Sequence, residues 1–128
     1  MSWYKVATKA DLVNNSGICV LLAGRQIALF ALTINQQLQL FAIDNYDPIG
    51  QANVLSRGIT GSLGERLVVA SPLYKQHFDL QNGQCLEMPE LTLTVYPVKW
   101  QQQEIWLQLS EPHPVAMPSS TLATEEVL

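Results

Sequence analysis

The apolar positions in the first part of the chain fall into short runs separated by turn residues. Apolar and polar β-formers alternate from Trp3, and three more apolar runs follow before residue 44. These runs predict strands at Trp3–Ala7, Ile18–Ala23, Gln26–Thr33 and Leu38–Ile43, with Gly24-Arg25 as a two-residue hairpin turn. Short strands joined in series by tight turns predict an all-β fold, a small antiparallel sandwich or barrel.

The second part of the chain continues the strand pattern with more glycine and proline. Strands are expected at Arg66–Ala70, at His77–Leu80 and Gln84–Leu86 across an Asn82-Gly83 turn, and at Leu93–Val98 and Glu104–Leu109. Helical turns are expected at Lys9–Val13, with Thr8 as its cap, and at Ala52–Ser56, while Gly61 and Gly64 are expected in a surface loop.

We therefore expect a single domain over residues 1–110, with a subdomain inserted at about 44–87. Residues 111–128 are rich in Pro, Ser, Thr and Glu and are expected to form a flexible tail. Val127-Leu128 could dock on another surface or remain free.

Composition narrows the class of protein. The 128 residues suit one domain, and residues 1–110 carry seven basic and eight acidic side chains. Without a basic stripe, nucleic acid is not expected as a partner. No apolar run is long enough to cross a membrane and no signal peptide is evident, so a cytoplasmic location is expected. The two cysteines, Cys19 and Cys85, are expected to be buried structural thiols.

Two loops in the inserted subdomain carry the most specific pattern. The loops Asn45–Gly50 and Ser71–Gln76 precede a Phe-Asp-Leu sequence and a glycine. This layout resembles the cluster-binding half of a Rieske iron–sulfur domain, in which Cys-x-His and Cys-x-x-His hold a [2Fe–2S] cluster. The residues at the four ligand positions of that pattern are Tyr46, Pro48, Ser71 and Tyr74.

The frame without its ligands resembles one subfamily, the small subunits of the cytoplasmic NAD(P)H-dependent nitrite reductases. The phrases that carry this resemblance are Ile43–Pro48, Val54–Gly58, Ala70–Gln76 and Gly83–Glu87. It implies a Rieske-like fold and a non-catalytic subunit of a complex that reduces nitrite to ammonium. It also implies a large catalytic subunit as partner, carrying FAD, a [4Fe–4S] centre and sirohaem. The alternative is a stand-alone protein-interaction module on the same scaffold.

The residues at the ligand positions argue against a cofactor in this chain. Proline offers no donor, and serine and protonated phenols are poor ligands for iron at neutral pH. We expect no cluster, no metal and no catalytic residue. One hypothesis is that the rings of Tyr46 and Tyr74 fill the cluster space and pin the two loops together; alternatively, they are ordinary loop tyrosines.

The same loops present a candidate docking surface. Ile49 and Leu73 are expected at the exposed end of the subdomain, with Arg57 and Lys75 as charges at the rim. Ile49 and Leu73 could instead fold inward as loop core.

Other candidate groups are expected to be structural. His77 has no evident partner in the sequence, and His113 lies between prolines in the tail. Asp44 and Asp47 are expected to cap backbone amides, as Asx residues in tight loops do. The glycines at 58, 61 and 64 lack the Gly-Lys-Ser/Thr that would follow in a phosphate-binding loop.

Overall fold

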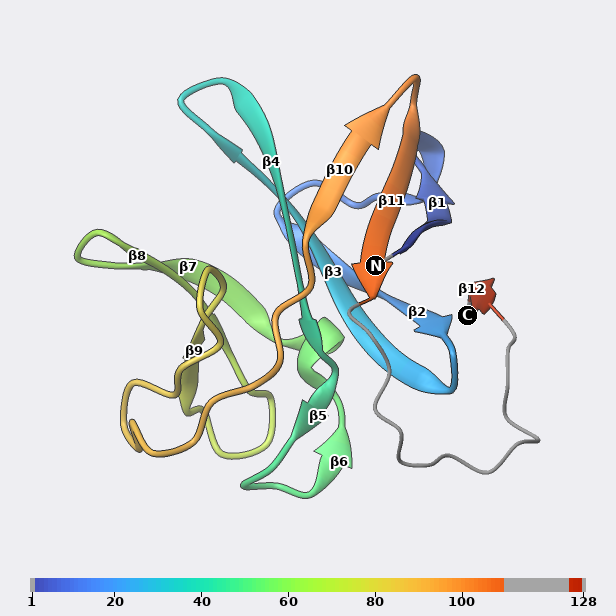
Figure 1. Cartoon of the computed structure of the whole chain (residues 1–128). Helices are drawn as coiled ribbons and strands as arrows, with labels where there is room; N and C mark the ends of the chain where they lie inside the picture. The colour runs from blue at the N-terminus through green and yellow to red at the C-terminus, as the bar shows by residue number, and fades with distance from the viewer. Residues whose placement is uncertain (1, 110–124, 128) are drawn as a thin grey trace.

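A computed structural model describes residues 2–109 and the backbone of residues 125–127. Their regular structure consists of β-strands and two short 3₁₀ turns, as expected for an all-β fold (Figure 1). One antiparallel sheet has the strand order β12-β2-β3-β4. Its strands are β2 (Ser16–Leu22), β3 (Arg25–Ile34), β4 (Gln37–Asp44) and β12 (Glu125–Val127).

Two tight turns set the register of this sheet. Leu22 pairs with Arg25, so the β2–β3 turn consists of Ala23 and Gly24, both with positive φ. The turn is thus one residue earlier than the predicted Gly24-Arg25. Asn35 and Gln36 also have positive φ and form the β3–β4 turn. Two consecutive residues in this conformation match the right-handed twist of the adjoining strands.

A second sheet has the order β1-β11-β10 and packs against the first. It consists of β1 (Ser2–Thr8), β10 (Val98–Gln101) and β11 (Glu104–Leu109), with Gln102 and Gln103 as the last hairpin turn. The strand predicted from Leu93 therefore starts only at Val98. The preceding residues bond the edge of β4 instead, where the Tyr96 amide donates to the Ala42 carbonyl at 2.9 Å.

The long strand β3 separates two hydrophobic cores because its side chains alternate between its faces. Ile27 and Leu29 lie in the core between the two sheets. Ala28 and Phe30 lie in the core shared with the inserted subdomain, which also holds Phe78. The insertion is thus held by a continuous apolar core and not only by its two connections.

The inserted subdomain contains two small sheets and a 3₁₀ turn. Its elements are β5 (Tyr46–Asp47), β6 (Ala52–Asn53), η2 (Leu55–Arg57), β7 (Ile59–Leu63), β8 (Arg66–Ala70) and β9 (His77–Asp79). The prediction of a surface loop around Gly61 is wrong: Gly61 lies in β7 and pairs with Val68. The helical turn lies at η2, somewhat later than predicted.

The connection after β9 is longer than the predicted two-residue turn. Phe78 pairs with Cys85 and the Asp79 amide donates to the Gln84 carbonyl, so residues 80–83 form a four-residue loop, within which the Gly83 amide donates to the Asp79 carbonyl. Asp79 also accepts hydrogen bonds from the amides of Gln81 and Asn82. These hydrogen bonds stabilise the longer loop in place of a two-residue turn at Asn82-Gly83.

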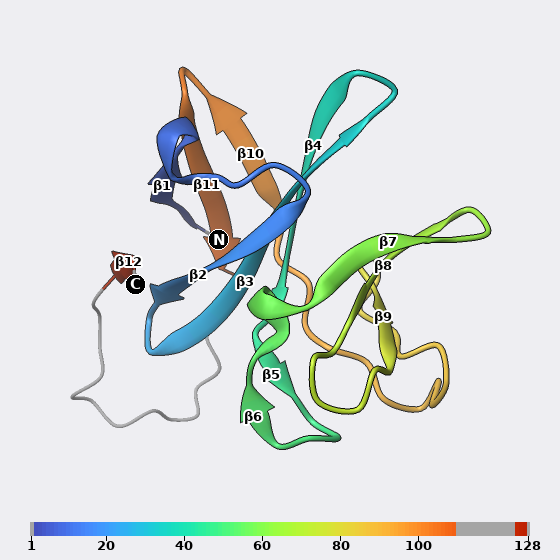
Figure 2. The same cartoon turned by 180° about the vertical axis from the view of Figure 1, so that it is seen from behind.

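Two further elements complete the base, the 3₁₀ turn that follows β1 and the strand β12. Lys9–Asp11 forms the 3₁₀ turn η1, where Asp11 accepts a hydrogen bond from the Thr8 amide at 2.8 Å. Residues 125–127 pair antiparallel with β2, beside β1 (Figure 2). The predicted tail 111–128 otherwise lies outside the described residues.

Candidate functional site

The two loops singled out in the sequence lie together at one end of the molecule. The first is the β5–β6 hairpin and the second connects β8 to β9, both at the bottom of Figure 1. We call residues 45–50 and 71–76 the tip loops. Their proximity follows from the fold of the subdomain, which brings the end of β4 beside the end of β8.

A buried hydrogen bond joins the tip loops. The Ser71 hydroxyl donates to Asp47 Oδ2 at 2.5 Å, and both side chains are fully buried. The other carboxylate oxygen accepts hydrogen bonds from the amides of Ile49 and Gly50. A buried carboxylate needs such partners because desolvation would otherwise be costly. The expectation that Asp47 caps loop amides is confirmed, whereas its link to Ser71 was not foreseen.

Leucine side-chain packing closes the remaining space between the loops. A Cβ placed on Gly50 would lie 2.5 Å from Leu73 Cδ1, so Leu73 covers this glycine closely. Leu73 is still 45% exposed, while Ile49 is half-buried against the subdomain core. Of the two apolar residues proposed for docking, only Leu73 therefore stands out from the surface.

The hypothesis that two tyrosine rings fill this space is wrong. Tyr46 is 43% exposed and Tyr74 is 62% exposed. The loops are nevertheless joined, but by Asp47, Ser71 and Leu73. The side chains of the two tyrosines are available at the surface instead.

The residues at the four ligand positions do not fit a [2Fe–2S] cluster. Pro48 has no side-chain ligand atom, and the hydroxyl of the one buried candidate, Ser71, donates a hydrogen bond to Asp47. No group of three or more His, Cys, Asp or Glu side chains within the described residues is arranged to hold a metal ion. Iron in such clusters is held by thiolate or imidazole donors, which these positions do not offer.

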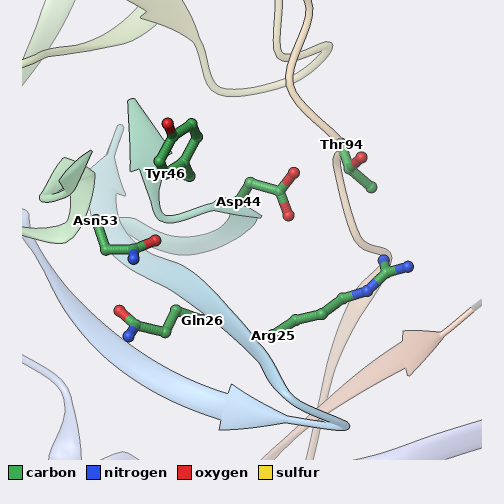
Figure 3. A pocket seen from close by; sticks show the side chains of 6 residues that line it. All are labelled: Arg25, Gln26, Asp44, Tyr46, Asn53 and Thr94. Atoms are coloured by element: carbon green, nitrogen blue, oxygen red, sulfur yellow. The ribbon is translucent and has the colours of Figure 1, made fainter. Parts of the chain in front are cut away.

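A polar pocket of about 330 Å³ lies beside Tyr46 (Figure 3). Its lining residues are Arg25, Gln26, Asp44, Tyr46, Asn53 and Thr94. Ligand pockets for cofactors are mostly apolar and enclosed, which this one is not. Its lining includes one positive and one negative side chain and several neutral hydrogen-bonding groups. Such a lining can bind polar groups of another molecule.

Two hydrogen-bond networks hold the wall of this pocket. The Tyr96 hydroxyl donates to Asp44 at 2.6 Å and accepts from Arg25. Burial and this hydrogen bond to Asp44 raise the pKa of Tyr96, so its phenol remains a donor. Asn45, 2% exposed, donates to Gln26 and accepts from the Ser56 amide at 2.6 Å. Sequence reasoning missed these residues because their partners are distant along the chain.

The two proposed rim charges lie in different places. Lys75 is exposed in the second tip loop and has a positive φ of 67°. Arg57 ends η2, which packs against β2, and its charge acts on the thiol of Cys19. Arg57 therefore belongs to the base of the subdomain.

His77 has a partner that the sequence did not reveal. Its Nδ1 lies 2.6 Å from Glu87 Oε2, and its amide donates to the other carboxylate oxygen. Partial burial raises the pKa of Glu87, but these hydrogen bonds outweigh that effect and lower it overall. The pair connects β9 to the returning chain and lies at the surface, a structural arrangement.

The thiol of Cys85 donates a weak hydrogen bond to Glu87 Oε1 at 3.9 Å, and that of Cys19 one to Gln26 at 3.6 Å. Burial raises the pKa of both thiols, so they remain protonated at neutral pH. Cys85 is fully buried, as predicted, while Cys19 is half-buried beside Gln26. Neither is placed as a nucleophile, because an activated thiol needs a lowered pKa and access to a substrate, whereas both pKa values are raised and Cys85 is fully buried.

Within residues 2–109 and 125–127, no helix is long and apolar enough to span a membrane.

Comparisons with known proteins agree with the fold and the loop pattern. Residues 2–108 match the family described as a Rieske-like [2Fe-2S] domain. The nitrite reductase (NADH) small subunit of Salmonella typhimurium is 37% identical over 97 residues, which cover 76% of this chain and 88% of that protein. The solution structure of the nitrite reductase [NAD(P)H] small subunit from Erwinia carotovora is 35% identical, with a TM-score of 0.72, and the match covers 98% of this chain and 96% of that one.

A third relative is much longer. The nitrite reductase [NAD(P)H] large subunit of Klebsiella oxytoca is 36% identical over 105 residues, which cover 82% of this chain but only 11% of that large subunit. With the matches above, these similarities extend over nearly all the described residues. The chain belongs to the Rieske-like domain family and, within it, to the small subunits of the NAD(P)H-dependent nitrite reductases.

Proposed function

We propose that this chain is the non-catalytic small subunit of a cytoplasmic nitrite reductase that converts nitrite to ammonium with NADH or NADPH. The observation that carries the proposal is the match to small subunits over nearly their whole length. The chemistry of the site favours a non-catalytic role, because the Ser71 hydroxyl and Asp47 are both fully buried and no metal-binding group is assembled within the described residues. The chain's contribution is to bind and orient the large subunit.

The large subunit is the proposed partner. The Klebsiella large subunit includes a 105-residue part that is similar to this chain. One polypeptide there joins a domain of this kind to the rest of a large subunit. In this protein the same association is proposed to form between separate chains, and the large subunit to carry FAD, a [4Fe–4S] centre and sirohaem.

The docking surface is proposed to be the tip loops. Leu73 and Tyr74 are large, exposed and adjacent, and Lys75 supplies a charge beside them. Tyrosine is enriched among binding hot spots, and exposed apolar patches mark interaction sites. Ile49 supports this surface from below, whereas Arg57, at the base of the subdomain beside β2, lies outside it.

Co-purification tests the proposed function. The chain and the large subunit encoded by its own source are expressed together, with a tag on the chain only. A stable complex with flavin and sirohaem absorbance that reduces nitrite with NADH or NADPH is the expected result. If the large subunit is soluble and loaded but fails to co-purify, the chain is instead an interaction module for another partner.

Variants of the tip loops test the docking surface. Leu73→Asp and Tyr74→Asp are expected to weaken the complex at least about tenfold, as loss of an interface hot spot does. Leu63→Asp is the matched control, because Leu63 is 44% exposed and pairs with Arg66 at the end of the β7–β8 hairpin farthest from the loops. Equal affinities for all three variants would place the interface elsewhere. Ile49→Asp is less suitable, since Ile49 packs against the core.

Iron content tests the proposal that the chain holds no cluster. The purified chain is incubated anaerobically with iron and sulfide, and a Rieske ferredoxin is treated in parallel as a positive control. The chain is expected to show neither stoichiometric iron nor the visible spectrum of a [2Fe–2S] centre. A bound cluster with that spectrum would contradict the proposal and require ligands other than residues 46, 48, 71 and 74.

A further inference from the structure

The base sheets leave an opening at the end of the molecule opposite the tip loops. The edge of β4 is bonded to the returning chain by two hydrogen bonds, from Tyr96 N to the Ala42 carbonyl at 2.9 Å and from Asp44 N to the Thr94 carbonyl at 3.0 Å. Beyond this point the β3–β4 and β10–β11 hairpins diverge, at the top of Figure 1.

The free backbone groups of both edges face this opening. Backbone groups of a strand alternate in direction, so Leu38 and Leu40 point the same way as Ala42 and Asp44, away from β3. No backbone hydrogen bond from the described residues reaches them there. The edge is therefore an unused template for one more strand.

The edge of β10 is open in the same way. The Gln108 amide donates to the Pro97 carbonyl, so Pro97 and Lys99 direct their groups toward β11. By the same alternation Val98 and Trp100 direct theirs outward, toward β4. Two unpaired edges thus flank a single opening.

A groove of about 350 Å³ occupies this opening. Its lining residues are Lys9, Leu38, Leu40, Val98, Lys99 and Trp100. Leu40 and Val98 pack against the core between the base sheets, while Leu38 is 39% and Trp100 40% exposed. We call these six residues the seam groove. Its floor continues the hydrophobic core, so apolar side chains of a ligand would be buried there.

The charges around the seam groove favour an acidic ligand. The Lys9 amine lies 5.9 Å from the centre of the Trp100 ring, and the Lys99 amine 4.5 Å from that of Trp3. Among the described residues neither amine has an ion pair, because Asp11 accepts from Thr8 and Glu104 pairs with Lys5 at 3.3 Å. Lysines beside an open edge also oppose pairing between two copies of the chain.

The opposite edge of the same sheet shows what kind of segment it accepts. There, residues Glu125–Val127 of the chain's own C-terminal region pair with β2 as strand β12. Their sequence, Glu-Glu-Val, combines acidic and apolar residues. One edge is thus extended by an added strand, whereas the β4 edge is not.

We propose that the seam groove is a second binding site, which takes an extended segment of alternating acidic and apolar residues from a partner protein. The segment pairs with the outward edge of β4 and places its apolar side chains against Leu38, Leu40 and Trp100. Successive side chains of a strand point to opposite faces, so the segment's acidic side chains lie on the outer face, on the side of Lys99. This mode is β-strand addition, in which main-chain hydrogen bonds give affinity and the side pockets give specificity.

The test uses the full chain and a six-residue peptide that alternates valine and glutamate, with a valine–lysine peptide of equal length as control. Amide hydrogen exchange is followed by NMR. The acidic peptide is expected to bind saturably and to slow the exchange of the Leu38 and Leu40 amides at least tenfold. The basic peptide is expected to leave them unchanged.

Charge variants give a second measurement. Lys99→Glu is expected to weaken binding of the acidic peptide about three- to tenfold at low salt, since an attraction becomes a repulsion. Lys75→Glu, an equal charge change in the tip loops, is expected to have no effect beyond a small long-range one. Absence of saturable binding at millimolar peptide, equal binding of both peptides, or protection confined to other amides would each overturn the proposal.

Discussion

The two ends of the molecule differ in how closely their neighbouring segments pack. At the tip loops, Asp47 and Ser71 form a buried hydrogen bond and Leu73 covers Gly50, so the gap is closed. At the seam groove, the edges of β4 and β10 diverge and their outward backbone groups stay unpaired among the described residues. The tip loops have the loop spacing of a cofactor site, yet the unpaired backbone groups that could bind another molecule lie at the seam groove.

This contrast shows that a loop pattern shared with a family does not by itself mean that the loops can bind the family's cofactor. The tip loops have the spacing of a cluster site but side chains that bond to each other. The seam groove has no motif in the sequence, because it is formed by residues about 60 positions apart. A site can therefore be evident in the sequence and be chemically closed, while an open one goes unnoticed.

The largest effect on stability is expected when the closed end is opened. Asp47→Ala leaves the Ser71 hydroxyl and two loop amides without their acceptor, so the free energy of unfolding should fall by about 3 kcal/mol. Urea denaturation measures this loss. Asp11→Ala, which removes an exposed carboxylate that bonds Thr8, is the control and should cost much less. Similar losses for both variants would mean that the tip loops are not held by Asp47.

A smaller effect is expected at the ion pair of the subdomain, where Arg66 Nε lies 2.8 Å from Asp79. Burial would raise the pKa of Asp79, but hydrogen bonds from Arg66, Gln81 and Asn82 outweigh it and hold the pKa below its ordinary value. A carboxyl whose pKa is lower in the folded state stabilises the fold above its unfolded pKa, near 4, and loses that contribution as pH falls through the folded pKa.

Asp79→Asn should therefore reduce the free energy of unfolding by about 1–2 kcal/mol at pH 7, and by progressively less below about pH 4. Denaturation curves of both proteins over this pH range provide the measurement. Glu90→Gln, at an exposed position, serves as the control for a simple loss of charge. A deficit that stays constant down to pH 2 would exclude the ionised carboxylate as its cause.

The smallest effect is expected at the open end. Leu38→Thr keeps a residue suited to strands at a position that is 39% exposed, so the free energy of unfolding should change by less than about 0.5 kcal/mol. Thermal or urea unfolding will reveal whether the seam groove contributes to the fold. A loss above 2 kcal/mol would show that Leu38 belongs to the core and would remove the contrast between the ends.

Much of the strand pattern was predictable because apolar alternation and turn residues are local signals. The strands β2, β3, β4, β8 and β11 agree with the apolar runs within a few residues. The β2–β3 turn was misplaced by one residue because Ala23 adopts the positive φ usually taken by glycine. Gly61 was assigned to a loop because its strand β7 gains its order from pairing with β8.

The candidate site was predictable in outline but not in its contacts. The loop spacing identified positions 46, 48, 71 and 74. The size of a tyrosine ring suggested that Tyr46 and Tyr74 would fill the space, yet both are exposed. A buried carboxylate requires donors, and only the folded chain shows that Ser71 and two amides supply them to Asp47.

The sequence alone determined the fold family and the absence of thiolate and imidazole donors at the ligand positions, because both depend on residue identity and spacing. The tertiary structure decided which residues close the tip loops and where a free edge remains. Those outcomes depend on how strands twist and diverge, which brings Leu38 and Leu40 opposite Val98 and Trp100. No local pattern encodes the distance between two such edges, since it results from packing of the whole core.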